Sequence, residues 1–283
     1  MDIKTFGVIG AGQMGNGIAQ VAAMSGLNVI MNDIRDEFVE RGLGNITKLL
    51  SKSVEKGKMT NEEKNAVLGR IKSSVSLKDM SSADFVVEAA TENESLKFGI
   101  FKDLDSICAP HVILSSNTSS IPIGRIASQT KRPDKVIGMH FMNPVPVMKL
   151  VEVIRALATS DETFKTTWDL SLKFGKTPAE ANDFPGFIAN RILLPMINEA
   201  VYCLYHSVGT PEAIDTVMKL GMNHPMGPLA LADLIGLDTC LAIMETLYNG
   251  FKDSKYRPCP LLRKYVEAGW LGRKTGRGFY EYK

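Results

Sequence analysis

Short apolar runs alternate with helical stripes through the first half of the chain. The runs at residues 4–9, 27–31, 84–89 and 112–116 are typical of buried strands, and we predict helices over residues 13–25, 36–56, 60–69 and 96–107. Strand–helix alternation predicts an α/β fold with a mostly parallel, doubly wound sheet. Because ligands of such sheets bind at the carboxyl ends of the strands, polar residues just after those ends are the first candidates for a site.

The pattern changes near residue 185, where the strand signals end. Residues 187–207 form a long apolar stretch with helical character, and further helices are predicted from residue 210 and across residues 229–247. We therefore predict a sheet-containing domain over residues 1–184 and an all-helical C-terminal domain over residues 185–283. So small a helical domain cannot bury all its apolar residues alone, which predicts a homodimer or a higher homo-oligomer formed through it.

A glycine-rich turn, GAGQMG, follows the first apolar run at once. Gly10 permits a tight turn, Gly12 lets backbone N–H groups approach a pyrophosphate, and Gly15 lets the next helix pack close to the strand. Gln13 and Met14 open that helix, whose N-terminal N–H groups favour phosphates. In this context the loop predicts a dinucleotide-binding domain of Rossmann-like fold. The alternative is the same turn without a ligand.

Asp33 follows the second apolar run, 18 residues after Gly15. An acid about 20 residues beyond the glycine loop reaches the adenosine ribose. Its carboxylate would accept hydrogen bonds from the ribose hydroxyls and repel a 2′-phosphate, so we predict NAD rather than NADP. Arg35 keeps NADP open as the alternative, because a nearby arginine can accommodate that phosphate. Glu92 with Lys97, and Asn117 with Ser119, also follow predicted strand ends and are expected near the same crevice.

Two β-type runs flank a turn with two prolines at residues 136–154. If they fold back symmetrically about Pro146, His140 faces Glu152 with Cβ atoms ~5 Å apart, whereas a slip of one residue would separate them. A histidine paired with a carboxylate suits hydride transfer to and from an alcohol, because the imidazole can take or return the hydroxyl proton. The alternative is a satisfied core histidine, and the nucleotide loop favours acid–base chemistry.

Composition and charge narrow the classes of partner. A net charge of +2 over 283 residues gives no general reason to expect nucleic acid or an anionic membrane. The four cysteines and four histidines are dispersed without metal-ligand spacing, so we expect no metal and free thiols in a reducing cytoplasm. No apolar run reaches the ~18 residues of a transmembrane helix, and the first strand leaves no room for a signal peptide. We predict a cytoplasmic protein.

Six stretches stand out in order along the chain: GAGQMG, VVEAATENESLK, SSNTSS, GMHFMNPVPVMKLVEV, DFPGFIANRILLPMINEA and HPMGPLALADLIGLD. Together with the closing residues 274–280, they resemble the short-chain L-3-hydroxyacyl-CoA dehydrogenases from end to end. Within that family they look most like the bacterial 3-hydroxybutyryl-CoA dehydrogenases. The resemblance implies NAD as cofactor and the interconversion of (S)-3-hydroxybutyryl-CoA and acetoacetyl-CoA.

The resemblance also implies which residues act on the substrate. His140 would be the catalytic acid and base, with Glu152 as its partner. Ser119 would hydrogen-bond the substrate C3 oxygen, and Asn190 would position the same group from the helical domain. By residue type alone, Ser119 could instead be a loop-capping hydroxyl and Asn190 a helix-surface amide.

A second set of residues would contact the cofactor. The resemblance places Glu92 and Lys97 beside the NAD ribose and phosphates, and Asn117 and Asn143 beside the nicotinamide half. Lys274 would approach the cofactor from the C-terminal tail. Without the motif around them, Glu92 and Lys97 would be ordinary surface charges.

Lysines 48, 52 and 56 stand four residues apart on one face of the helix predicted over residues 36–56. Coenzyme A carries a pyrophosphate and a 3′-phosphate, and Lys52 and Lys56 are our candidates to meet those charges. The alternative is a solvated helix face.

Two rival functions share part of this pattern. A β-hydroxyacid dehydrogenase of the 6-phosphogluconate type has a similar glycine loop and a helical second domain, but it relies on a lysine for proton transfer. A non-catalytic NAD-binding protein, like the crystallins that resemble this family, could lose the pair of His140 and Glu152. This chain keeps the pair, which favours the enzyme.

Overall fold

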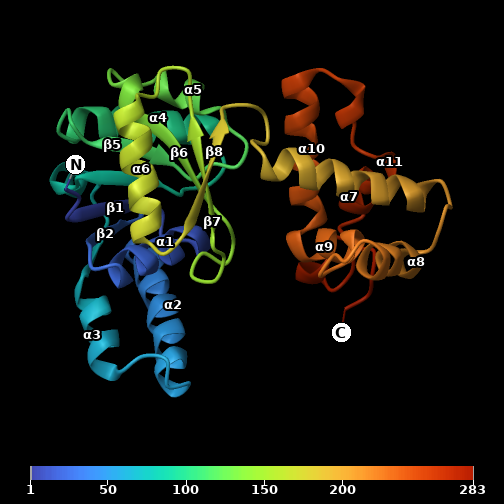
Figure 1. Cartoon of the computed structure of the whole chain (residues 1–283), viewed down its shortest axis with the longest axis horizontal. Coiled ribbons are helices and arrows are strands. Elements are labelled where there is room, and N and C mark those ends of the chain that lie inside the picture. Colours follow the sequence, from blue (N-terminus) through green and yellow to red (C-terminus); the bar gives the residue numbers. More distant parts are fainter. Residues whose placement is uncertain (1, 283) are drawn as a thin grey trace. The chain divides into compact units, whose positions relative to one another are not determined.

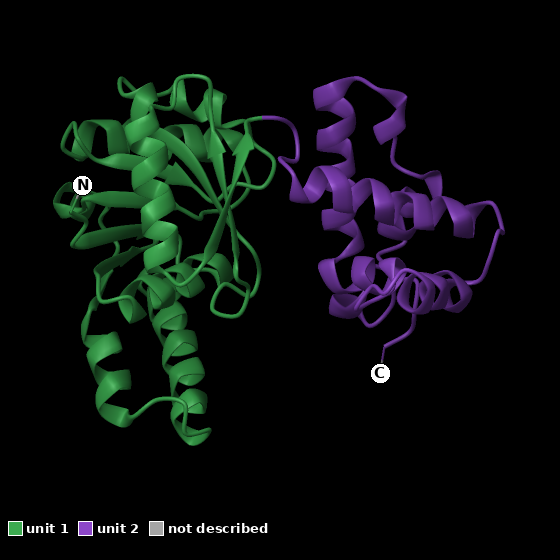
Figure 2. Ribbon diagram, viewed as in Figure 1, with its two compact units in different colours: residues 1–183 green, residues 184–283 purple. Residues whose placement is uncertain are grey.

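A computed structural model describes residues 2–282 of the chain. The chain divides into two compact units, residues 1–183 (unit 1) and residues 184–283 (unit 2), as Figure 2 shows. This division falls one residue before the boundary suggested by the sequence. The named strands all belong to unit 1, and the named elements of unit 2 are helical.

Unit 1 is built on one eight-stranded sheet with the order β3-β2-β1-β4-β5-β6-β7-β8. Its strands are β1 (Thr5–Ile9), β2 (Asn28–Asn32), β3 (Ile71–Ser74), β4 (Phe85–Glu88), β5 (Ile113–Ser116), β6 (Val136–Phe141), β7 (Leu150–Arg155) and β8 (Thr177–Asn182). Neighbouring strands run parallel except β6 and β7, which pair antiparallel. The predicted Rossmann-like α/β fold is confirmed. The strand order reverses between β1 and β4, where ligands of such sheets bind.

The two edge strands, β3 and β8, were not predicted from the sequence. β3 buries only its first and last residues, so no apolar run marks it. β8 has the sequence TPAEAN, with Pro178 inside the strand. Proline and polar side chains are tolerated in strands at a sheet edge, where one side of the backbone needs no partner.

Helices connect the strands of unit 1. They are α1 (Gln13–Met24), α2 (Asp36–Glu55), α3 (Asn61–Gly69), α4 (Glu94–Ile107), α5 (Ile123–Ala127) and α6 (Asp161–Lys173), with 3₁₀ turns η1 (Leu77–Ser82) and η2 (Pro133–Lys135). The four predicted helices are confirmed to within two residues at each end. α2 and α3 lie side by side and extend beyond the sheet (Figure 1). α3 begins with a capping box in which Thr60 and Glu63 bond each other's backbone N–H groups at 3.1 and 2.8 Å.

Unit 2 packs its helices around an apolar core of its own. The elements are α7 (Ala189–Tyr205), α8 (Pro211–Thr216), the π-helical turn η3 (Val217–Gly221), α9 (Pro228–Ile235), α10 (Leu237–Phe251), η4 (Ser254–Tyr256), α11 (Pro260–Glu267) and η5 (Arg273–Thr275). Thr210 caps α8 by accepting a hydrogen bond from the Ala213 N–H, at the residue from which the sequence predicts a helix. The helical region predicted over residues 229–247 consists of two helices that meet at Gly236, where φ is 103°.

Two buried aspartates, Asp215 of α8 and Asp233 of α9, fasten the last residues of the chain to these helices, and we call the pair the tail anchor. Asp233 is 1% exposed and accepts hydrogen bonds from the backbone N–H groups of Phe279 and Tyr280 at 2.9 and 3.0 Å. It also accepts one of 2.9 Å from the Tyr282 hydroxyl. Burial and this hydrogen bond raise the pKa of Tyr282 to about 12.

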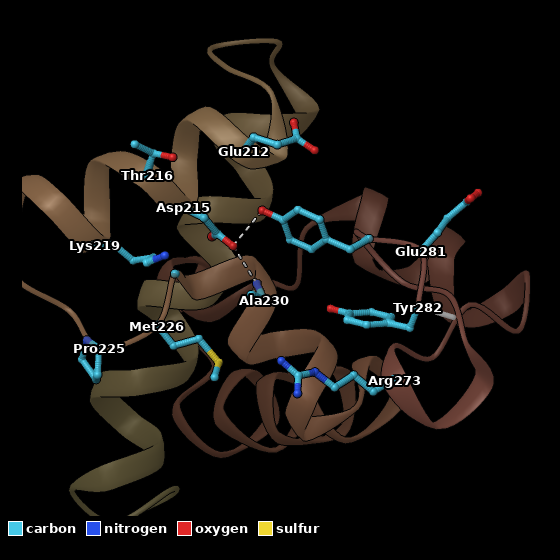
Figure 3. A pocket seen from close by; sticks show the side chains of 12 residues that line it. Glu212, Asp215, Thr216, Lys219, Pro225, Met226, Ala230, Arg273, Glu281 and Tyr282 are labelled. Atoms are coloured by element: carbon cyan, nitrogen blue, oxygen red, sulfur yellow. Dashed lines mark hydrogen bonds between the residues drawn. The ribbon is translucent and has the colours of Figure 1, made fainter.

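Asp215 makes the second half of the tail anchor. It accepts hydrogen bonds of 2.9 Å from the N–H groups of Leu229 and Ala230, and one of 2.8 Å from the Tyr280 hydroxyl. Figure 3 shows its carboxylate at a cavity of about 550 Å³, with the bond to Ala230 dashed. Asp215 accepts N–H groups of the first turn of α9 and so caps this helix. The N-cap residue itself, Gly227, has no side chain that could do so.

Residues 2–282 contain neither a membrane-spanning helix nor a cluster of metal ligands. No helix there is long and apolar enough to cross a membrane. No group of three or more His, Cys, Asp or Glu side chains in the same residues is placed to hold a metal ion. The four cysteines are free thiols, and burial raises the pKa of Cys108 to about 11 and that of Cys240 to about 12.

Candidate active site

The glycine loop has the backbone geometry that its sequence predicts. Gly10 adopts a φ of 97°, a conformation that favours glycine. A Cβ on Gly15 would collide with the Gly10 carbonyl oxygen, so only glycine lets α1 start so close to the end of β1. A Cβ on Gly12 would meet nothing within 4 Å, so space lies open beside the first turn of α1, which starts at Gln13 and Met14. That space, at the positive end of a helix, fits a pyrophosphate.

Asp33 lies directly after β2 and reaches back to the glycine loop. Its Oδ2 accepts a hydrogen bond of 2.7 Å from the Ala11 N–H, and its Oδ1 accepts one of 2.7 Å from the Ile34 N–H. The carboxylate is thus fixed beside the loop, where it can receive ribose hydroxyls. The Arg35 guanidinium lies 3.2 Å from the Glu37 carboxylate, a partner that competes with any 2′-phosphate.

The hairpin of β6 and β7 has the predicted register. His140 is paired with Glu152 across the two strands, and His140 Nδ1 lies 2.8 Å from Glu152 Oε2. The two residues are 8% and 1% exposed. A buried carboxylate at this distance fixes the ring and favours a proton on Nδ1, so Nε2 is the nitrogen that can exchange a proton with a ligand.

Two asparagines tie the loops at the carboxyl edge of the sheet together. Asn117, the residue after β5, accepts on its Oδ1 a hydrogen bond of 2.8 Å from the Phe141 N–H, next to His140. Asn143 accepts on its Oδ1 one of 3.1 Å from Gln13 Nε2, in the first turn of α1. The loop after β5, the hairpin and the glycine loop therefore form one connected region of unit 1.

Lys97 corrects an expectation from residue type, because it is not a surface charge. It is 1% exposed, and its Nζ donates hydrogen bonds to Glu88 Oε1 at 2.6 Å and to the Ala90 carbonyl at 3.2 Å. It also lies 3.4 Å from Glu92 Oε2. Glu88, at the end of a wholly buried strand, supplies the negative charge that makes an internal lysine tolerable.

Glu92 faces the loop after β5. Partial burial alone would raise the pKa of Glu92, but the charge of Lys97 and hydrogen bonds from Thr118 and Ser120 lower it below its usual value. Ser119 donates its backbone N–H to the same carboxylate at 3.0 Å. The structure thus brings Glu92, Lys97 and Ser119 together, and their contacts with cofactor or substrate stay predictions.

Cationic residues of α2 line a cavity of about 590 Å³ together with the glycine loop and the turn of the hairpin. They are Lys52, which is a predicted CoA-binding residue, and Lys48 and Arg41, which were not among the predicted binding residues. Lys56 is the C-cap residue of α2 and does not line this cavity. The spacing of residues 41, 45, 48 and 52 was the available signal, since such steps of three and four place side chains on one helix face.

Two predicted site residues belong to unit 2. Asn190 lies in the first turn of α7 and donates its backbone N–H to the Gly186 carbonyl at 3.1 Å. The Lys274 ammonium bonds both carboxylate oxygens of Asp238, at 2.5 and 2.6 Å. Their roles toward substrate and cofactor stay predictions.

Comparison with known proteins assigns both parts of the chain to one family. Residues 5–184 match the profile of the 3-hydroxyacyl-CoA dehydrogenase NAD binding domain, and residues 186–282 match that of the 3-hydroxyacyl-CoA dehydrogenase C-terminal domain. The match over both domains sets aside the 6-phosphogluconate type of enzyme.

Individual relatives agree over their full length. A probable 3-hydroxybutyryl-CoA dehydrogenase of Bacillus subtilis is 63% identical over all of this chain and 99% of its own. A 3-hydroxybutyryl-CoA dehydrogenase of Bradyrhizobium diazoefficiens is 56% identical over 99% of this chain and 96% of its own. The crystal structure of (S)-3-hydroxybutyryl-CoA dehydrogenase from Ralstonia eutropha, 54% identical, covers both chains fully with a TM-score of 0.98. The chain therefore belongs to the 3-hydroxyacyl-CoA dehydrogenase family, as an enzyme that uses NAD.

Proposed function

We propose that the chain interconverts (S)-3-hydroxybutyryl-CoA and acetoacetyl-CoA, with His140 as the acid and base. The observation that carries the proposal is the buried contact of 2.8 Å between His140 Nδ1 and Glu152 Oε2 at the carboxyl edge of the sheet. The names of the relatives from Bacillus subtilis and Ralstonia eutropha support the four-carbon substrate.

The proton chemistry follows from this pair. When bound at the glycine loop, NADH would supply the hydride for reduction. His140 Nε2 donates a proton to the C3 oxygen as the ketone is reduced, and it takes the hydroxyl proton in the reverse direction. Glu152 stabilises the imidazolium form and holds the ring with Nε2 toward the substrate. Ser119 and Asn190 hydrogen-bond the C3 oxygen and place it for the transfer.

The cofactor and the CoA moiety would be held by different groups. Asp33 would receive the adenosine ribose of NAD, and Asn117 and Asn143 would lie near the nicotinamide half. For the CoA phosphates, the cations of α2 are the candidates, Lys52 at the cavity and Lys56 at the end of the helix. An ammonium group favours a phosphate through a charge-assisted hydrogen bond.

We propose further that the enzyme works in the cytoplasm as a homodimer or a higher homo-oligomer assembled through unit 2. Large apolar side chains are exposed there, among them Ile192 at 67%, Val208 at 75% and Leu220 at 80%. Patches of this kind usually meet a partner, and a second copy is the commonest one. Light scattering on the purified chain tests this, and a monomer at all concentrations would contradict it.

The experiment that tests the function is NADH oxidation with acetoacetyl-CoA by the native chain and by His140→Gln. We expect turnover by the native chain and a fall in kcat of ~10²–10⁴-fold in the variant, since this is the usual contribution of general acid–base catalysis. His111→Gln, at an exposed histidine, is the matched control. A native chain that binds NADH without turnover would make it a non-catalytic NAD-binding protein. Full turnover by His140→Gln would refute the role of the pair.

A further inference from the structure

Residues 117–120, which we call the serine loop, are gathered around a single carboxylate oxygen. Glu92 Oε1 accepts hydrogen bonds from the Thr118 hydroxyl at 2.6 Å and from the Ser120 hydroxyl at 2.7 Å. It also accepts the backbone N–H groups of Ser119 and Ser120, at 3.0 and 3.1 Å. One side chain from a different part of the chain thereby sets the backbone path on both sides of Ser119.

Glu92 is itself fixed by the buried charges behind it. Lys97 Nζ lies between Glu88 Oε1, at 2.6 Å, and Glu92 Oε2, at 3.4 Å. The other oxygen of Glu88 accepts a hydrogen bond of 2.7 Å from the Ser116 hydroxyl, at the end of β5. The strand end that leads into the serine loop and the carboxylate that holds the loop are thus joined through one lysine.

The far side of the serine loop is tied to the hairpin. Asn117 Oδ1 accepts the Phe141 N–H, next to His140. The loop is therefore held at one end against β6 and at the other end against Glu92. With both ends fixed, the distance between Ser119 and His140 is set by the protein before any substrate arrives.

We propose that Glu92 is a positioning residue for Ser119, and that Lys97 holds Glu92 in place. This role adds to the place beside the cofactor that the family resemblance implies for both residues, and it rests on the proposed function through the role of Ser119. We call the hydrogen bonds between Glu92 and the serine loop the brace. Because misplacing a catalytic group by about 1 Å can cost ~10²-fold in rate, losing the brace would lower kcat.

Amide hydrogen exchange tests the brace without any measurement of enzyme activity. In Glu92→Ala, the segment of residues 117–121 should exchange at least about tenfold faster than in the native chain, because the N–H groups of Ser119 and Ser120 lose their bonds to Glu92. Glu94→Ala is the matched control, since Glu94 lies on α4 and pairs with Arg125 on the surface. Unchanged exchange in Glu92→Ala would overturn the proposal whatever the enzyme's substrate.

The link to catalysis is tested by a double-mutant cycle at saturating NADH. Glu92→Ala should lower kcat by roughly 10–100-fold, and Glu92→Gln, which keeps an acceptor oxygen, should recover most of it. If Glu92 acts through Ser119, the double variant Glu92→Ala/Ser119→Ala loses no more than Ser119→Ala alone.

Three results would overturn the catalytic part. These are additive losses in the cycle, an unchanged kcat in Ser119→Ala, or a raised Kd for NADH with an unchanged kcat in Glu92→Ala, which would make Glu92 a contact of the cofactor only. Failure of the proposed function has a different signature. The native chain would not turn over acetoacetyl-CoA, while faster exchange in Glu92→Ala would still support the brace.

Discussion

Buried or partly buried carboxylates serve two regions of this molecule in different ways. At the carboxyl edge of the sheet in unit 1, Glu152 faces His140 and Glu92 faces Lys97, so each acid has a partner that can carry positive charge. In the tail anchor of unit 2, the hydrogen bonds to Asp215 and Asp233 come from backbone N–H groups and tyrosine hydroxyls.

The nature of the partner separates chemistry from architecture. A carboxylate beside an imidazole can stabilise the protonated ring, so the pair can take up and release a proton during a reaction. A carboxylate that accepts bonds from neutral donors satisfies backbone groups that would otherwise be buried without a partner. We therefore expect substitutions in the first region to lower turnover, and substitutions in the tail anchor to lower stability.

Among the carboxylates of the two regions, the largest effect is expected for Glu152→Gln. An amide keeps the shape of the side chain but cannot stabilise a charged imidazolium, so kcat should fall by ~10²-fold or more. Glu180→Gln, on the neighbouring strand β8 and exposed, is the control. Steady-state rates with acetoacetyl-CoA and NADH measure the effect. A native kcat in Glu152→Gln would show that the contact with His140 is structural. The carboxylates of unit 1 would then not differ in role from those of the tail anchor.

The opposite pattern is expected for Asp233→Asn. The new amide group brings donors to a place where the Phe279 and Tyr280 N–H groups and the Tyr282 hydroxyl already donate, which leaves at least one of them without an acceptor. Each buried unsatisfied group costs about 1–3 kcal/mol, so the free energy of unfolding should fall by roughly 2 kcal/mol.

Urea denaturation measures this loss, and Glu267→Gln, at an exposed position of α11, is the control. The kcat of the folded Asp233→Asn variant should stay within about twofold of native. A loss of turnover comparable to that of Glu152→Gln would show that the tail anchor takes part in catalysis and would remove the distinction between the two regions.

The lysines of unit 1 also differ in their surroundings, and this difference predicts different roles. Lys97 is buried between carboxylates, whereas Lys52 and Lys56 are exposed and make no ion pair with residues 2–282. Replacing Lys52 and Lys56 together by alanine should raise KM for acetoacetyl-CoA by about tenfold, or ~1.4 kcal/mol, and leave the Kd for NADH unchanged. Lys102→Ala, at an exposed lysine of α4, is the control. An unchanged KM would refute the CoA role of α2.

The sequence was sufficient where a local rule decides the structure. The glycine loop and the register of His140 with Glu152 each depend on a few neighbouring residues, and both were predicted. β3 and β8 were missed because edge strands need no apolar run. The burial of Lys97 and the gathering of the serine loop around Glu92 depend on residues that come together only when β4, β5 and α4 pack. The tail anchor was missed for the same reason, since Asp233 meets residues 279–282 only in the folded chain.

The smallest effect should be a pH dependence at Glu92. Its pKa is lower in the folded protein than the ordinary value of 4.5, because the charge of Lys97 and the hydrogen bonds of the serine loop outweigh the opposing effect of partial burial. The folded state thus binds this proton less tightly than the unfolded chain does. The contribution of Glu92 to stability is therefore present above about pH 4.5 and is lost as the pH falls through the lowered pKa.

Glu92→Gln removes the titrating group, so the difference in free energy of unfolding between native and variant should shrink as the pH falls below 4.5. The change should be small, because the Glu92 side chain is 38% exposed and solvent screens its charge. Urea denaturation at about pH 7 and at two values below pH 4.5 measures it, with Glu94→Gln as the control for a surface pair. If the difference were constant with pH, the pKa of Glu92 would be unshifted, and neither Lys97 nor the serine loop would favour the charged form of Glu92. The partner's charge would then not distinguish Glu92 from the aspartates of the tail anchor, and the distinction drawn between the two regions would have to rest on Glu152 and His140.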